Sequence, residues 1–133
     1  MSSIFTRIIQ GEIPSYKIAE DDHFYTFLDI RPVRPGHTLV VPKVETDYLF
    51  DLPDHILHRM LPFAKHVASA IDKAQGCLRT GIVVEGLEVP HAHLHLIPIY
   101  QKGEHAALGS HVELSSDEMR VIAERIQKHI LST

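Results

Sequence analysis

Apolar residues recur at helical spacing in three parts of the chain. Residues 4–9 form the first, and Gly11 and Pro14 follow them, so we expect a short amino-terminal helix. Residues 53–76 predict one long helix, which either kinks at Pro62 or begins with a short separate piece before it. Its expected apolar stripe consists of Leu57, Leu61, Ala64, Val67, Ala68 and Ile71.

The third helical pattern closes the chain. Ser115 and Glu118 fit a capping box, in which each side chain accepts a hydrogen bond from the backbone of the other residue, so a helix is expected to begin there. Gly76 is expected to end the preceding long helix, because glycine readily adopts the left-handed conformation after a last helical turn. The expected apolar face of the last helix consists of Met119, Ile122, Ile126 and Ile130.

Five further stretches have the composition and the flanking turn residues of strands. They cover residues 16–20, 24–28, 37–42, 78–86 and 90–100. These strands come in runs and do not alternate one by one with helices. The order predicts an α+β fold with a five-stranded, mostly antiparallel sheet, one long helix, a carboxy-terminal helix and a short amino-terminal helix.

Composition narrows the classes of function. The 133 residues fit one domain, residues 1–133, and the formal net charge of -4 gives no general attraction to nucleic acid or to an anionic membrane. The single cysteine, Cys77, rules out an intrachain disulfide and suits a reducing compartment. Because the amino-terminal residues contain no long apolar run, we expect no membrane span and a cytoplasmic protein.

The segment PHAHLHLIP, residues 90–98, carries the strongest chemical signal. On a strand, its three alternate histidines share one face, and the apolar residues between them point into a core. Such a face could be the solvent side of an edge strand, a metal site, or a site for phosphate chemistry. Three histidines in a straight line do not converge easily on one ion, and structural zinc usually takes cysteine ligands, of which the chain has only Cys77. Neutral imidazole, in contrast, is a good nucleophile toward phosphorus. The histidines in question are His91, His93 and His95.

The stretch HAHLHLI also resembles the His-φ-His-φ-His-φ-φ signature of the histidine triad (HIT) superfamily of nucleotide hydrolases and transferases, where φ is an apolar residue. The stretch FLDIRPVRPGHTLVVPK, residues 27–43, resembles a second landmark of that family. The resemblance covers about residues 3–100. It implies a HIT-like fold and a homodimer in which two sheets join into one.

The resemblance also implies a role for each matching residue. His93 matches the nucleophile that attacks the α-phosphorus of a purine nucleotide conjugate, forming a nucleotidyl-histidine that water hydrolyses. His95 matches the residue that hydrogen-bonds the α-phosphate, and His91 and His37 match a supporting pair. Asp29 matches the carboxylate that accepts the ribose hydroxyls. The apolar walls around the base would be Phe5, Ile8, Phe27 and Ile30.

The chain departs from the family pattern just before the triad. Where the family usually reads Gly-Gln-Ser/Thr-Val, this chain has Gly-Leu-Glu-Val, which places Leu87 and Glu88 at the two polar positions. Glu85 likewise replaces an asparagine. A carboxylate beside a phosphate is unfavourable unless it faces a cation, so our hypothesis is that Glu88 contacts an amine-bearing or otherwise cationic leaving group.

Some members of the family carry a structural zinc through a Cys-x-x-Cys pair and a downstream histidine. The matching positions here are Ser3, Thr6 and Glu45, so the resemblance predicts no such zinc site. We therefore expect no metal and no cofactor. The expected function is that of the phosphoramidase-like branch. The alternatives are a dinucleoside polyphosphate hydrolase, a nucleotide-binding regulatory protein with little catalysis and, last, a metal-binding module.

Overall fold

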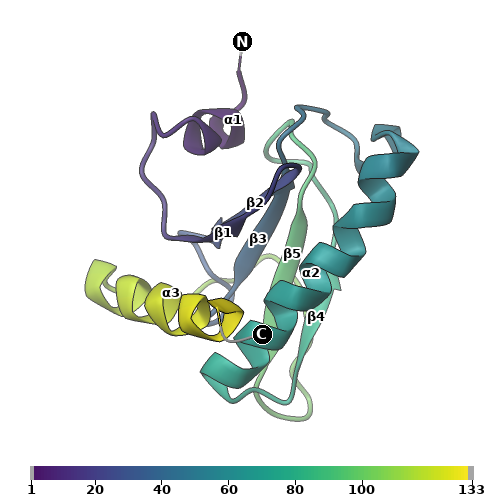
Figure 1. The fold of residues 1–133 in the computed structure, drawn as a ribbon. Coiled ribbons are helices and arrows are strands. Elements are labelled where there is room, and N and C mark those ends of the chain that lie inside the picture. Colours follow the sequence, from purple (N-terminus) through teal and green to yellow (C-terminus); the bar gives the residue numbers. More distant parts are fainter. Residues whose placement is uncertain (1, 132–133) are drawn as a thin grey trace.

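The computed structural model describes residues 2–131, with only the backbone of residue 131, and it has the α+β architecture that the sequence predicts (Figure 1). In this part of the chain, one antiparallel sheet has the strand order β1-β2-β3-β5-β4. The strands are β1 (Lys17–Glu20), β2 (Phe24–Leu28), β3 (Thr38–Pro42), β4 (Arg79–Val83) and β5 (Leu94–Ile99). The helices are α1 (Ile4–Ile9), α2 (Asp54–Gln75) and α3 (Ser116–Leu131), with a single turn of 3-10 helix over Leu49–Asp51.

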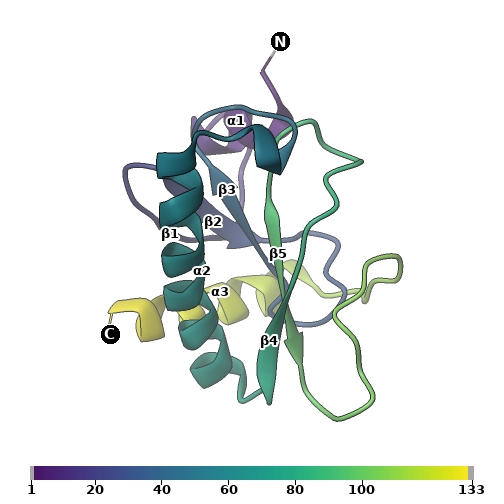
Figure 2. The same ribbon diagram turned by 90° about the vertical axis from the view of Figure 1, so that its right-hand side faces the viewer.

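Each face of the sheet is covered by different elements, as Figures 1 and 2 show. Helices α2 and α3 pack on one face, and the apolar core beneath them includes Phe24, Val40 and Leu96. Helix α1 covers part of the other face, where Phe5 and Ile8 pack with a second group of buried residues. That second group consists of Tyr25, Phe27, Leu39 and Val41. The strands therefore carry apolar residues in both directions, which explains why β2 and β3 are buried throughout.

The long helix corrects part of its predicted apolar stripe. Leu61 is 59% exposed, whereas Met60, the residue before it, is buried. Ile56, one helical turn before Met60, is buried as well. Two apolar stripes run side by side along this helix, and the one that meets the sheet and α3 is Ile56, Met60, Ala64, Val67, Ala70 and Ile71. Helix α2 continues through Pro62, so a separate first piece is wrong. Gly76 ends the helix in the left-handed conformation, as predicted.

The predicted capping box at the start of α3 is confirmed. The backbone N–H of Ser115 donates to Glu118 Oε1 at 2.9 Å, and the backbone N–H of Glu118 donates to Ser115 Oγ at 3.1 Å. Met119, Ile122 and Ile126 are buried, as their spacing predicts. Among residues 2–131, no helix combines the length and the apolar character that crossing a membrane requires.

The histidine segment corrects a second prediction. Strand β5 begins at Leu94, so His91 and His93 precede it and only His95 lies in the sheet. The reason is the pairing: β3 pairs with β5 no earlier than Leu94, and the backbone N–H of Ala92 instead donates to the carbonyl of Thr46. The alternation nevertheless persists, because Ala92, Leu94 and Leu96 all enter the core beneath α2 and α3.

Candidate active site

Four histidines that are far apart in the sequence lie together on the sheet face opposite α2. All are buried, with exposed fractions between 0% and 8%: His37, His91, His93 and His95. His37 directly precedes β3, and the residue after Thr38, Leu39, pairs with His95 of β5. The ring centroids of His37 and His95 are 5.2 Å apart, and those of His93 and His95 are 4.8 Å apart.

Hydrogen bonds determine which nitrogen of His37 and His95 carries the proton. The backbone N–H of Val33 donates to His37 Nδ1 at 2.9 Å. A backbone N–H can only donate, so Nδ1 of neutral His37 holds a lone pair and Nε2 holds the proton. That proton is donated to His95 Nδ1 at 2.9 Å. His95 in turn carries its own proton on Nε2, where it is available to a phosphate oxygen.

A second set of hydrogen bonds gives His93 the opposite tautomer. His93 Nδ1 lies 2.7 Å from the carbonyl oxygen of His91, so Nδ1 carries the proton and Nε2 the lone pair. His91 Nε2 lies 2.7 Å from the carbonyl oxygen of Pro42, and it therefore carries the proton in His91. The triad thus presents a lone pair on His93 beside a proton donor on His95.

Burial keeps these rings neutral. Desolvation is the main cause that lowers the pKa of His37 to about 4, and the same cause lowers the pKa of His95 to about 4. Desolvation also lowers the pKa of His91 and of His93, against the opposing effects of hydrogen bonds and nearby carboxylates. A histidine nucleophile must be unprotonated, so the site favours that form at neutral pH.

We expect acidification to destabilise the protein between pH 6.5 and about 4. Below pH 6.5 the unfolded chain binds protons at His37 and His95, whereas the folded chain binds them only near pH 4, so the free energy of unfolding falls across this window. Urea unfolding at several pH values measures the slope. The double variant His37→Gln/His95→Gln should show a shallower slope than wild type. Equal slopes in the two proteins would contradict this expectation.

Asp29 lies beside these rings at the end of β2. Its Oδ1 accepts the backbone N–H of Arg31 at 2.9 Å, and its Oδ2 lies 3.6 Å from His37 Nε2. Burial, which outweighs the hydrogen bond from Arg31, raises the pKa of this carboxyl above its usual value. The structure thus brings the sequence-predicted Asp29 next to the histidines.

The same region resembles a cation site by proximity alone. One ligand atom each from Asp29, His37 and His95 lies within 4.8 Å of the others. A metal ligand must offer a lone pair, but the N–H of Val33 leaves His37 Nε2, the nitrogen facing both partners, with a proton. The tautomer therefore suits the hydrogen bond from His37 to His95 and does not suit ligation of a metal.

The four predicted wall residues lie in different surroundings. Phe5 packs edge-on against His93, with ring centroids 5.0 Å apart, and against His91 at 5.8 Å. Ile8 and Phe27 are buried in the same apolar group as Phe5. Ile30, next to Asp29, is 73% exposed. Phe5 is thus the wall residue in contact with the triad, and contact of all four with a base stays a prediction.

The loop before the triad, where the sequence departs from the family pattern, is open to solvent. Leu87 is 90% exposed, and Glu85 and Glu88 are exposed as well. Glu88 is nevertheless one of the charges that act to raise the pKa of His93, so its electrostatic influence reaches the triad.

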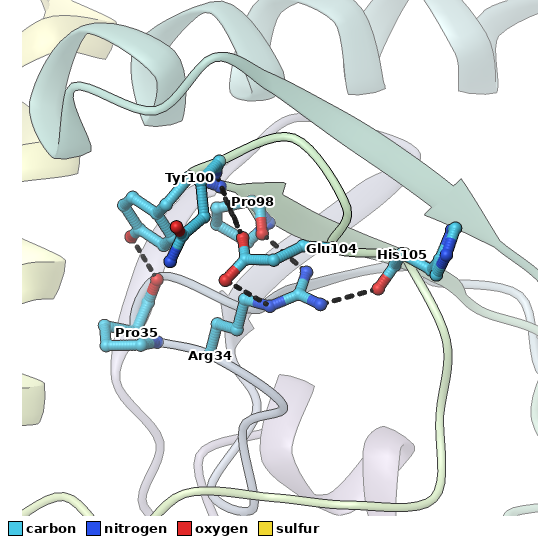
Figure 3. Close-up of polar contacts among 7 residues, drawn as sticks. Arg34, Pro35, Pro98, Tyr100, Glu104 and His105 are labelled. Atoms are coloured by element: carbon cyan, nitrogen blue, oxygen red, sulfur yellow. Dashed lines mark hydrogen bonds and ion pairs between the residues drawn. The ribbon is translucent and has the colours of Figure 1, made fainter.

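Sequence reasoning missed the group that holds the loop between Asp29 and His37 (Figure 3). Arg34 donates from Nη1 to the carbonyl of Pro98 at 3.0 Å and from Nη2 to the carbonyl of His105 at 2.7 Å. Its Nε lies 3.7 Å from Glu104 Oε2, and Glu104 Oε1 accepts the backbone N–H of Tyr100. The prolines and glycine of this segment signal a rigid loop, but a charge alone does not reveal its partners.

Replacing Arg34 by Met should lower the free energy of unfolding by about 2 kcal/mol, because the carbonyl of buried Pro98 and the carbonyl of exposed His105 both lose a charged donor. Urea unfolding at pH 7 measures the change. Arg31→Met is the matched control: Arg31 lies in the same loop and is exposed, so its loss should cost less than about 0.5 kcal/mol. Equal effects of the two substitutions would contradict a clamping role for Arg34.

The sequence matches the family model of the HIT domain over residues 10–102. The chain belongs to the HIT family. Adenosine 5'-monophosphoramidase HNT1 of Saccharomyces cerevisiae is 42% identical over 96 residues, which cover 71% of this chain and 61% of the yeast protein. The hnt1 protein of Schizosaccharomyces pombe, with the same description, is 34% identical over 134 residues, 98% of this chain and 99% of that protein.

A solved HIT-family structure supports the fold. The Zn-bound histidine triad family protein from Mycobacterium smegmatis superimposes with a TM-score of 0.84 at 27% identity, covering 99% of this chain and 95% of that one. The predicted family resemblance and the HIT-like fold are confirmed.

Proposed function

We propose that this HIT-family protein hydrolyses purine nucleoside 5'-phosphoramidates at the α-phosphorus through a covalent intermediate on His93. The observation that carries the proposal is the pair of tautomers: His93 Nε2 holds a lone pair, and His95 Nε2 holds a proton. Family membership and the two relatives described as adenosine 5'-monophosphoramidases support a hydrolase. The specific substrate is our proposal.

The proposed reaction has two steps at phosphorus. His93 Nε2 attacks phosphorus and forms a P–N bond, the P–N bond to the amine breaks, and the leaving nitrogen takes a proton from solvent and departs as the neutral amine. His95 donates a hydrogen bond to a phosphoryl oxygen, where charge accumulates in the transition state. The carbonyl of His91, which already accepts the Nδ1 proton of His93, stabilises the positive charge that develops on the ring. Water then attacks phosphorus, the bond between phosphorus and His93 Nε2 breaks and returns its electron pair to the ring, the proton of the water goes to solvent, and the nucleoside monophosphate leaves.

Substrate positioning is assigned to the residues around this pair. Asp29 would accept both hydroxyls of the ribose, because a carboxylate offers acceptors to both. Phe5, Ile8, Phe27 and Ile30 would flank the purine. His37 would act through His95 by fixing its tautomer, and His91 would act through His93. A dinucleoside polyphosphate fits less well, because its additional negative charges would approach Glu85 and Glu88.

Intact-mass spectrometry tests the proposal. Wild-type protein quenched shortly after mixing with adenosine 5'-phosphoramidate should carry one adenylyl group. The adduct should be absent in His93→Ala and present in His58→Ala, in which an exposed histidine of α2 is removed. An adduct in His93→Ala would contradict the assignment of the nucleophile, and no adduct and no released adenosine monophosphate with wild type would contradict the proposed activity.

Glu88 should favour a cationic leaving group. Its charge reaches His93 electrostatically, so an ammonium on the leaving group would meet a partner near the reacting centre. We expect kcat/KM to be higher for a phosphoramidate with a cationic amine than with a neutral amine, and Glu88→Gln should reduce that ratio about threefold, the scale of an exposed ion pair. Glu85→Gln, in the same loop, is the control. An unchanged ratio in Glu88→Gln would refute the idea.

We also propose that the protein forms a homodimer through the free edge of β4. The other edge, β1, is engaged by α3, since Gln127 Nε2 donates to the carbonyl of Lys17 at 2.6 Å. Apolar side chains are exposed on and around β4, among them Leu78, Ile82 and Val84. Light scattering should give the mass of two chains, and a monomer mass would contradict this proposal.

A further inference from the structure

A polar cluster lies where α1 begins, and it consists of Ser3, Thr6, Glu45 and His91. Its hub is Glu45 Oε1, which accepts the backbone N–H of Ser3 at 2.7 Å and the hydroxyl of Thr6 at 2.6 Å. One carboxylate oxygen thus ties the first turn of α1 to the loop that follows β3. The three positions that match the structural-zinc ligands of some family members, Ser3, Thr6 and Glu45, therefore hold a hydrogen-bonded cluster.

The protons in this cluster can be assigned. His91 Nε2 carries a proton because it faces the carbonyl oxygen of Pro42, so Nδ1 of the neutral ring holds a lone pair. Ser3 Oγ lies 2.6 Å from that Nδ1 and 3.2 Å from Thr6 Oγ1, and it donates its proton to the nearer acceptor, Nδ1. Thr6 Oγ1 is farther from Nδ1, at 3.4 Å, and its proton is already given to Glu45. The Ser3 oxygen also accepts the backbone N–H of Thr6 at 3.0 Å, so the hydroxyl both donates and accepts a hydrogen bond.

The cluster reaches the proposed nucleophile by two routes. The first is the backbone, because the carbonyl of the same His91 accepts the Nδ1 proton of His93. The second is packing: Phe5 lies between Ser3 and Thr6 in sequence, and its ring contacts the rings of both His91 and His93. Moving the start of α1 would therefore disturb both the hydrogen bond and the contact that orient His93.

We propose that Ser3 and Glu45 are positioning residues for His93. Glu45 anchors the start of α1, and the Ser3 hydroxyl fixes the ring of His91, the residue whose backbone carbonyl orients His93. The kinetic part of this inference rests on the proposed function. The hydrogen-bond part does not, because it concerns the resting protein. Two independent readouts can therefore separate the parts.

The first readout is the state of the His91 ring in the full-length protein. Long-range nitrogen–proton correlation NMR should show His91 with a protonated Nε2 and a hydrogen-bonded Nδ1. In Ser3→Ala the Nδ1 resonance should move toward that of an unbonded lone pair, and the His93 resonances should shift with it. Ser3→Thr keeps the hydroxyl and should keep the wild-type resonances, as should Ser2→Ala, the change of the neighbouring exposed serine.

The second readout is the rate at which the adduct forms from adenosine 5'-phosphoramidate. Ser3→Ala and Glu45→Ala should each lower the rate constant about tenfold, with KM changed less than about twofold, as expected for loss of an orienting hydrogen bond. Ser3→Thr should restore the rate, and Glu45→Gln, which keeps an acceptor oxygen, should retain most of it. Asp47→Ala, which removes an exposed carboxylate from the same loop, is the control.

The outcomes are distinguishable. Unchanged rate constants in both Ser3→Ala and Glu45→Ala would overturn the positioning roles, and so would an unmoved His91 resonance in Ser3→Ala. A proportional loss in the Ser2→Ala and Asp47→Ala controls would also overturn them, since the effect would not be specific to the cluster. Wild-type protein that shows the hydrogen-bonded His91 but no turnover would overturn the proposed function instead.

Discussion

His93→Gly should lower turnover of adenosine 5'-phosphoramidate by about 10⁴-fold or more, because in the proposed reaction its Nε2 supplies the attacking lone pair. The neighbouring rings are unsuited to replace it. His95 Nδ1 accepts the proton of His37, and His91 Nε2 donates to a backbone carbonyl. The measurement is kcat/KM from the release of adenosine monophosphate, with the far-ultraviolet circular dichroism spectrum as a check on folding.

Added imidazole provides the discriminating control. Removing the ring leaves a space beside Phe5, which packs edge-on against His93 in the intact protein. Free imidazole entering that space should restore part of the turnover of His93→Gly, and it should not affect wild type. Rescue by imidazole would establish that the lost atom is the nucleophilic nitrogen. Turnover in His93→Gly within tenfold of wild type without imidazole would contradict nucleophilic catalysis by His93.

The gathering of the triad could be predicted from the sequence because it depends on a local pattern. The apolar Ala92, Leu94 and Leu96 are drawn into the core beneath α2 and α3, which forces the intervening histidines to the other face. This holds even though the strand begins only at Leu94. Burial of alternate residues thus determined which face of the sheet the histidine side chains occupy. The residue at which β5 begins depended instead on where β3 could pair with it.

The tautomers could not be predicted, because their causes are nonlocal or leave no trace in side-chain identity. Val33 acts on His37 through its backbone N–H, which every residue except proline possesses. Ser3 and His91 are separated by 88 residues, and nothing in either neighbourhood signals the hydrogen bond between them. The sequence therefore predicted which residues gather, and only the structure indicates which nitrogen of each ring carries the proton.

The stripe of α2 shows a different limit. Leu61 is as apolar as Met60, so periodicity alone offers two possible buried positions one residue apart, whereas Leu57 packs partly buried against the core as predicted. Contact with α3 and the sheet decides between them, and this contact depends on the whole fold. Sequence patterns thus identify helices more reliably than the side of a helix that is buried.

Substitutions at His95 should separate the two ring nitrogens. The amide nitrogen of glutamine can occupy the place of Nε2, and that of asparagine the place of Nδ1. Since His95 Nδ1 accepts the proton from His37, the proton available for phosphate is on Nε2. We therefore expect His95→Gln to retain kcat within about tenfold of wild type, whereas His95→Asn and His95→Leu should lose about 10²–10³-fold, the cost of removing one donor to a charged transition state.

The comparison of asparagine with glutamine is the sharpest part of this test. Both amides are polar and smaller than imidazole, so a loss caused by altered packing or polarity would affect both, and urea unfolding would report it. The two amides differ in the position of the N–H and by one methylene group, and urea unfolding measures the packing cost of the shorter side chain. If asparagine at position 95 retained more activity than glutamine, the proton would have to reach the phosphate from Nδ1. That result would reverse the tautomers of His37 and His95 and remove the role assigned to the Val33 N–H.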